Sequence, residues 1–152
     1  MVATTSQNFT VLIRVRYAEC DAQSVVFNAR YGDYVDVVAT EFLRALFGGY
    51  QKMLDEGLDS QVVRMTINWK SSARFDDILA IRAETDHVGD SSYSFSMEFT
   101  DYASGRLVAN SEIVYVMVQP DRQGKMTIPD HLRAALSREL EETIIDLAAT
   151  DL

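Results

Sequence analysis

The chain has little cysteine, histidine and proline, and the first two shortages bear on what the protein is. Its one cysteine, Cys20, excludes an internal disulfide and favours the reducing cytoplasm as the compartment. The two histidines, His87 and His131, are isolated and have no cysteine partner, so they predict no metal site. No apolar run approaches the length of a membrane span, and we therefore expect no membrane-spanning segment.

Basic residues are also scarce relative to acidic ones. The 14 lysines and arginines face 23 aspartates and glutamates, which gives a formal net charge of −9. This balance argues against a general nucleic-acid binder, because such proteins need a basic surface for the phosphate backbone. The length of 152 residues and the hydrophobic content of 47% are typical of a single globular domain spanning residues 1–152.

In the N-terminal third of the chain, the spacing of the apolar residues changes once, from that of a strand to that of a helix. Residues 9–17 alternate between apolar and polar side chains, which predicts a half-buried strand. From Asn28 to Phe47 the apolar residues recur at helical spacing, and Gly48-Gly49 ends the element. Because the back face of this helix is also largely apolar, we expect other structure to surround it.

The rest of the chain is dominated by strand signals. A short helix is predicted over Tyr50–Glu56, and strands follow at Val63–Lys70, Ile78–Glu84, Tyr93–Phe99 and Leu107–Val118, the last being apolar enough to predict a central place. A terminal helix begins near Thr127–Asp130, and its apolar face carries Leu132, Leu136, Leu140 and Leu147. Short turns between strands favour an α+β fold, a five-stranded antiparallel sheet wrapped around one long helix, with a C-terminal helix.

One short segment suggests chemistry. Asp21 follows the first strand, and Asn28 begins the long helix seven residues later. A carboxylate beside the free backbone N–H groups of a helix N-terminus can attack a carbonyl and polarise it. The alternative is structural, since an acid after a strand often only caps a turn and Asn28 is a typical helix N-cap.

Several segments resemble one family. The stretch from Arg16 to Tyr31, with Asp21 followed by Val25-Val26, resembles the signature of hotdog-fold acyl-CoA thioesterases of the 4-hydroxybenzoyl-CoA thioesterase type. Trp69–Asp77, Gly105–Ala109 and Gly124–Asp130 are similar to later segments of that family. Two positions depart from the pattern: Ser24 stands where the family usually has glycine, and Ser72 where it commonly has proline.

The resemblance implies an enzyme that hydrolyses an acyl-CoA thioester to a carboxylate and coenzyme A, without metal or redox cofactor. It also implies a homodimer or homotetramer with a shared site. Asp21 would be the nucleophile or general base, and the Asn28 backbone N–H would polarise the carbonyl. Substrate-lining residues would be Val26, Phe27, Tyr31 and Tyr34, for which a core role is the alternative. The residues that would bind coenzyme A are Lys70, Ser71, Arg74 and Arg106.

Other interpretations stay open at this point. Glu41, on the long helix, is a rival catalytic acid. A non-catalytic acyl-thioester or lipid binder would share the fold, and a hydratase or dehydratase is disfavoured because no histidine lies between Asp21 and Phe47. The sequence leaves the acyl group undetermined, and also the choice between coenzyme A and acyl carrier protein. For Cys20, the neighbouring carboxylate of Asp21 predicts a raised pKa and an unreactive thiol.

Overall fold

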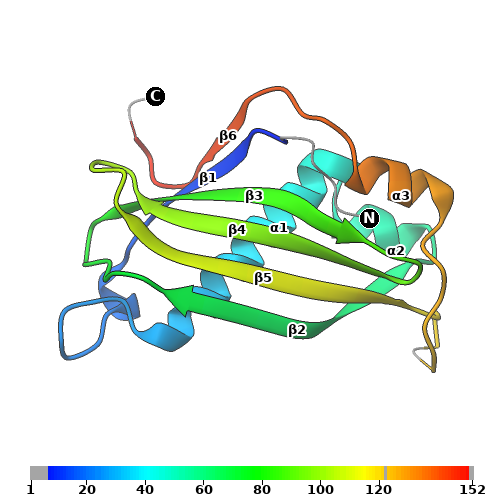
Figure 1. The fold of residues 1–152 in the computed structure, drawn as a ribbon, viewed down its shortest axis with the longest axis horizontal. Helices are drawn as coiled ribbons and strands as arrows, with labels where there is room; N and C mark the ends of the chain where they lie inside the picture. The colour runs from blue at the N-terminus through cyan, green and yellow to red at the C-terminus, as the bar shows by residue number, and fades with distance from the viewer. Residues whose placement is uncertain (1–6, 122, 151–152) are drawn as a thin grey trace.

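The computed structural model describes residues 7–121 and 123–150, and its centre is a sheet with one long helix crossing it (Figure 1). In the described residues the sheet has six strands in the order β2-β5-β4-β3-β1-β6. Neighbouring strands are antiparallel except β1 and β6, which run parallel. The α+β prediction of five antiparallel strands and one central helix is confirmed, and β6 is an addition. The strands are β1 (Phe9–Arg14), β2 (Asp59–Trp69), β3 (Ile78–Val88), β4 (Ser92–Asp101), β5 (Leu107–Val118) and β6 (Thr143–Asp146).

The long helix α1 (Tyr31–Phe47) is preceded by a tight turn of 3₁₀ helix, η2 (Asn28–Arg30), so the helical run begins where the sequence predicted. It ends at Gly48, whose φ of 102° lies in the left-handed region that glycine adopts without steric cost. The Gly48 N–H donates to the Arg44 carbonyl oxygen at 2.9 Å and closes the last turn. The short helix α2 (Tyr50–Asp55) follows directly.

The hydrophobic core lies between α1 and the inner face of the sheet. The Phe42 ring of α1 is 5.1 Å from the Phe9 ring of β1 and 4.8 Å from the Phe95 ring of β4, measured between centroids. The C-terminal helix α3 (Asp130–Leu136) adds buried Leu132 and Leu136 to the same cluster. Contacts from both the sheet and α3 explain why α1 is apolar beyond a single stripe.

The terminal helix is shorter than the sequence predicted, and the extension of its apolar face to Leu140 and Leu147 is wrong. The helix ends at Leu136, and β6 begins at Thr143. The Thr143 N–H donates to the Asn8 carbonyl oxygen and the Leu147 N–H to the Leu12 carbonyl oxygen, both at 2.9 Å. Pairing with the otherwise open edge of β1 satisfies more backbone groups than a free helix end would.

Two details of the strands also differ from prediction. The first strand ends at Arg14, and Tyr17 begins a second 3₁₀ turn, η1 (Tyr17–Glu19), with 82% of its surface exposed. The strand β5 lies second from the edge instead of at the centre, and β2 forms the edge.

Among the helices that the structure describes, none is both long and apolar enough to cross a membrane.

Candidate active site

The loop between η1 and η2 folds back on itself like a small hairpin. Cys20 and Val26 form an isolated antiparallel bridge, and the Asp21 N–H donates to the Val25 carbonyl oxygen at 2.9 Å. At the tip, the Ser24 N–H donates to the Asp21 carbonyl oxygen at 3.0 Å, and the Gln23 N–H to the Asp21 Oδ1 at 2.8 Å. One carboxylate oxygen of Asp21 therefore holds the turn, while no described residue hydrogen-bonds to the other.

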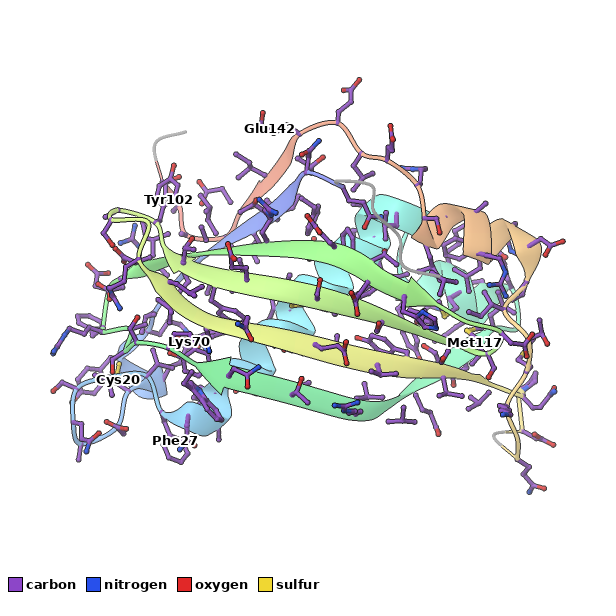
Figure 2. The ribbon with its side chains drawn as sticks, in the orientation of Figure 1. Cys20, Phe27, Lys70, Tyr102, Met117 and Glu142 are labelled. Atoms are coloured by element: carbon purple, nitrogen blue, oxygen red, sulfur yellow. The ribbon has the colours of Figure 1, made fainter. Side chains whose placement is uncertain are left out.

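This loop is fixed against the connection between β2 and β3, about fifty residues further along the chain. Val25 forms a bridge with Arg74, and the Val26 N–H donates to the Ala73 carbonyl oxygen at 2.8 Å. Figure 2 shows the result, with Cys20, Phe27 and Lys70 gathered at one end of the molecule and Met117 towards the other. Two of the four segments that carried the resemblance, Arg16–Tyr31 and Trp69–Asp77, thus come together in space.

A cavity of about 340 Å³ opens where these segments meet the start of α1. Its lining includes six of the predicted site residues: Asp21, Val26, Asn28, Tyr31, Lys70 and Ser71. It also includes four residues that we did not predict: Gln23, Val25, Trp69 and Ser72. For Trp69 the signal was available, since it is the only tryptophan and directly precedes Lys70. We call this the Asp21 cavity.

Four predicted residues lie outside the lining of the Asp21 cavity. Phe27 is 46% exposed, and Arg74 is exposed while its backbone bridges Val25. Arg106 reaches the cavity rim indirectly, because its Nη1 donates to the Ser72 carbonyl oxygen at 2.9 Å and also bonds the Ser71 hydroxyl. Tyr34 is buried in the core. The functional roles given to these four residues stay predictions.

Glu19 is a buried residue that we did not predict as part of the site, and its hydrogen bonds hold several neighbouring residues in place. Its Oε1 accepts hydrogen bonds from the Tyr34 hydroxyl at 2.9 Å and from the Arg16 N–H at 2.8 Å. Its Oε2 faces the Arg16 guanidinium at 3.1 Å, and its backbone oxygen accepts the Phe27 N–H at 2.9 Å. Burial, and then the contact with Glu19, raises the pKa of Tyr34 far above its ordinary value. The phenol therefore stays protonated and donates.

Asn28, which lines this cavity, begins the helical run and has an unused backbone donor. The Phe27 N–H bonds to Glu19 and the Arg30 N–H to Phe27, whereas the Asn28 N–H has no acceptor among the described residues. Such an N–H is able to donate to a ligand oxygen. The residues that line the Asp21 cavity thus include the acid Asp21, Asn28 with its free N–H, and the cation Lys70.

Glu41, the rival catalytic acid, and the two histidines lie outside the lining of the Asp21 cavity. The Glu41 Oε2 forms an ion pair with Arg44 and does not line the Asp21 cavity. His87 on β3 and His131 on α3 are both exposed, and the His131 Nε2 contacts the Glu56 Oε1 at 2.6 Å. Desolvation, followed by the charges of Glu19 and Asp21, raises the pKa of Cys20, as expected. Within the described residues, no cluster of three or more metal-binding side chains exists.

A sheet packed around one long helix is the arrangement called the hotdog fold. Residues 15–136 match the family model of the thioesterase-like superfamily, and the chain belongs to this family. It is 29% identical over 122 residues to the acyl-CoA thioester hydrolase YbgC of Escherichia coli, covering 80% of this chain and 90% of that protein.

Solved structures show the same fold. A hypothetical protein from Aquifex aeolicus superposes with a TM-score of 0.77 at 25% identity, covering 84% of this chain and 98% of that one. A 1,4-dihydroxy-2-naphthoyl-CoA thioesterase from Synechocystis superposes with a TM-score of 0.76 at 19% identity, covering 84% and 94%. The predicted fold and the predicted thioesterase family are both confirmed.

Proposed function

We propose that this protein hydrolyses acyl-CoA thioesters in the Asp21 cavity, giving a carboxylate and the free thiol of coenzyme A. The observation that carries the proposal is that one cavity is lined by Asp21 and by Asn28, whose backbone N–H has no acceptor among the described residues. Family membership and the likeness to YbgC, whose name is acyl-CoA thioester hydrolase, support the same reaction. Water supplies one oxygen to the acyl carbon, the C–S bond breaks, and the sulfur leaves as the thiol or thiolate.

Asp21 acts on the thioester carbon in this proposal by one of two routes. Its free carboxylate oxygen attacks the carbonyl carbon to form an anhydride that water then cleaves, or it takes a proton from an attacking water. In both routes the carbonyl oxygen gains negative charge, and the Asn28 N–H is able to donate to it. One such donor is typically worth about 3–4 kcal/mol of transition-state stabilisation. Neither route needs a metal or redox cofactor.

Basic residues in and beside the cavity are suited to bind the coenzyme A part of the substrate. Lys70 lines the cavity, and Arg106 is held at its rim by the Ser71–Ser72 backbone and hydroxyl. We assign these cations, with Arg74 nearby, to the phosphates of coenzyme A, because an otherwise acidic protein needs local positive charge to hold them. Val26 and Tyr31 then form walls beside the thioester. Cys20, the single cysteine, fits a reducing cytoplasm as the compartment.

A homodimer is part of the proposal. β2 is an edge strand, and Val63 on it is 59% exposed. Val62, Met65 and Trp69 on the same strand are also exposed. An apolar open edge of this length is a template for pairing with a second strand. Pairing through β2 of a second copy covers this edge with closed twofold symmetry.

The test is release of free thiol from a panel of short aliphatic, long aliphatic and aromatic acyl-CoAs. We expect Asp21→Asn to lower kcat by about 10²–10⁴-fold. The fold survives, because the Asn side-chain oxygen still accepts the Gln23 N–H that Asp21 accepts now. Asp33→Asn is the matched control, since Asp33 is an exposed acid of α1 paired with Arg30.

Two outcomes contradict the proposal. Equal turnover by Asp21→Asn overturns the assignment of Asp21. Wild-type protein that binds acyl-CoA without releasing thiol from any member of the panel identifies a binding protein and not an enzyme.

A further inference from the structure

Glu19 joins the two sides of the loop that carries Asp21, and no step of the proposed hydrolysis uses it. Its backbone oxygen accepts the Phe27 N–H at 2.9 Å, and its Oε1 accepts the Tyr34 hydroxyl of α1 at 2.9 Å. Asp21 follows Glu19 by two residues, and Asn28 follows Phe27 by one. The two groups assigned to the reaction are thus both anchored close to Glu19.

One hydrogen bond joins this loop to the long helix. Among the described residues, the bond from Tyr34 to Glu19 is the only hydrogen bond between residues 17–27 and α1. The Tyr34 ring is 2% exposed and meets the Tyr31 ring edge-on, with centroids 5.9 Å apart, so packing fixes the direction of its hydroxyl. This bond is therefore the directional contact that sets how the loop lies against α1.

An acid is a poor choice at position 19 if its side chain only adds stability. Taking a carboxylate out of water is costly, and well-packed apolar side chains of similar volume are often at least as stabilising. The ion-pair partner of Glu19, Arg16, has a side chain that is 77% exposed, so their attraction is weakened by solvent. The acid supplies what an apolar side chain lacks, an acceptor that holds the Tyr34 hydroxyl in one direction.

The proposed reaction depends on such a direction. The reacting atoms must lie about 3–3.5 Å apart, and the Asn28 N–H must at the same time reach the carbonyl oxygen of the same thioester. A misplacement of about 1 Å can lower the rate by about 100-fold. Because Asp21 lies on the loop and Asn28 begins the helical run, the joint at Glu19 determines how far apart they are.

We propose that Glu19 and Tyr34 are positioning residues for thioester hydrolysis. Their hydrogen bond holds the Asp21 carboxylate and the Asn28 N–H at the separation that the transition state requires. This inference rests on the proposed function and adds two residues to it. Neither Glu19 nor Tyr34 lines the Asp21 cavity, so both act through the loop and not by contact with the acyl group.

Tyr34→Phe removes this bond and keeps the ring. We expect kcat to fall by about 10–100-fold and KM to stay within about 2-fold, because every residue that lines the cavity is unchanged. The measurement is free-thiol release from the acyl-CoA of the panel that the wild-type protein hydrolyses fastest.

Thr85→Val is the matched control for loss of a buried hydroxyl. The Thr85 side chain is buried, and its hydroxyl donates to the Leu136 carbonyl oxygen at 2.6 Å, joining β3 to α3 outside the Asp21 cavity. We expect this variant and Tyr34→Phe to lower the urea midpoint of unfolding by similar amounts. Only Tyr34→Phe should lower kcat.

A double variant separates positioning from stability. Glu19→Leu combined with Tyr34→Phe removes both partners and leaves an apolar pair, so its urea midpoint should equal or exceed that of Tyr34→Phe. Its kcat should still be lowered by about 10–100-fold. Glu19→Gln is the conservative rescue, because its amide oxygen is able to accept from the Tyr34 hydroxyl and the Arg16 N–H. Its kcat should stay within about 3-fold of wild type.

Two results overturn the inference. One is wild-type kcat in the double variant, and the other is a Glu19→Gln protein as slow as the double variant, which would show that the acceptor's direction does not matter. If Asp21→Asn is inactive in the same assay, the proposed function stands in both cases, so the failures of the two proposals are distinguishable. Slow turnover in Tyr34→Phe and the double variant, with Glu19→Gln and Thr85→Val near wild type, supports the inference.

Discussion

Ser24 has a φ of 64°, in the left-handed region that side chains with a Cβ rarely adopt. It lies at the tip of the loop that holds Asp21, where its N–H donates to the Asp21 carbonyl oxygen. Glycine, which the family pattern that this segment resembles has at this position, adopts such a φ without a steric cost. The chain keeps this conformation because bridges on both sides of the tip fix the loop.

Relief of this strain is measurable. We expect Ser24→Gly to raise the free energy of unfolding by about 1 kcal/mol, because glycine adopts positive φ without a steric cost. Urea unfolding followed by circular dichroism measures the change. Ser137→Gly is the control, since Ser137 has an ordinary φ of −99° and glycine there is not expected to stabilise. A destabilised Ser24→Gly protein would show that the serine side chain outweighs the strain.

At the scale of elements, the C-terminal segment separates into two structures with different surroundings. Helix α3 buries Leu132 and Leu136 completely against α1 and the sheet, whereas β6 forms an edge whose Ile144 is 45% exposed. The parallel pairing of β6 with β1 covers one end of the sheet and leaves β2 as the apolar edge. The edge of β1 is thereby covered by β6, a strand of only four residues, and the 11-residue β2 stays available for a second copy.

A leucine-to-alanine substitution is therefore expected to lower the free energy of unfolding by different amounts in α3 and just after β6. Leu132→Ala leaves a cavity in the core and is expected to lower the free energy of unfolding by about 2–5 kcal/mol. Leu147→Ala, at a position that is 52% exposed, is expected to change it by less than about 0.5 kcal/mol. Thermal unfolding of both variants compares them. Equal losses would indicate that both leucines share one buried helical face.

At the scale of the whole molecule, the buried tyrosines make the free energy of unfolding fall as the pH rises in the alkaline range. Burial raises the pKa of Tyr93 to about 12, and burial together with Glu19 raises the pKa of Tyr34. An unfolded tyrosine titrates near pH 10, so above that pH the unfolded chain has lost protons that the folded protein keeps. Stability is therefore fully present below about pH 10 and falls as the pH rises towards the folded pKa values.

The expected slope between pH 10 and 12 is about 1.4 kcal/mol per pH unit for each such tyrosine. Urea unfolding at pH 8, 10 and 11, with phenolate absorbance recorded in parallel, measures it. Tyr93→Phe should reduce the slope by the contribution of one tyrosine, about 1.4 kcal/mol per pH unit. Tyr17→Phe, at an exposed position, should leave the slope unchanged. A free energy of unfolding that stays constant across this range would contradict the prediction.

The open edge of β2 predicts the behaviour of the whole molecule in solution. We expect Val63→Lys to place a charge on this edge and shift the protein from dimer to monomer. Light scattering coupled to size-exclusion chromatography measures the mass. Leu147→Lys, an equally exposed position next to the opposite edge, should remain dimeric. A wild-type protein that is monomeric at micromolar concentration would rule out pairing through β2.

The sequence alone determined the order of helices and strands as far as α3, the long buried helix and the family, because these depend on local periodicity and short motifs. It also predicted Asp21, Asn28, Lys70 and Ser71 as residues of one site, and all four line one cavity, because each side of that cavity is formed by a contiguous segment.

Only the tertiary structure decided which segments meet. The bridge between Val25 and Arg74, the buried Glu19 under Tyr34, and the pairing of β6 with β1 join residues that are between 15 and more than 130 positions apart. Neither period nor propensity encodes such contacts, because they depend on which surfaces remain unpaired once the helix and sheet have packed. The same holds for a cavity of about 270 Å³ whose wall comes from α1, α2, β2, β4 and β5 together.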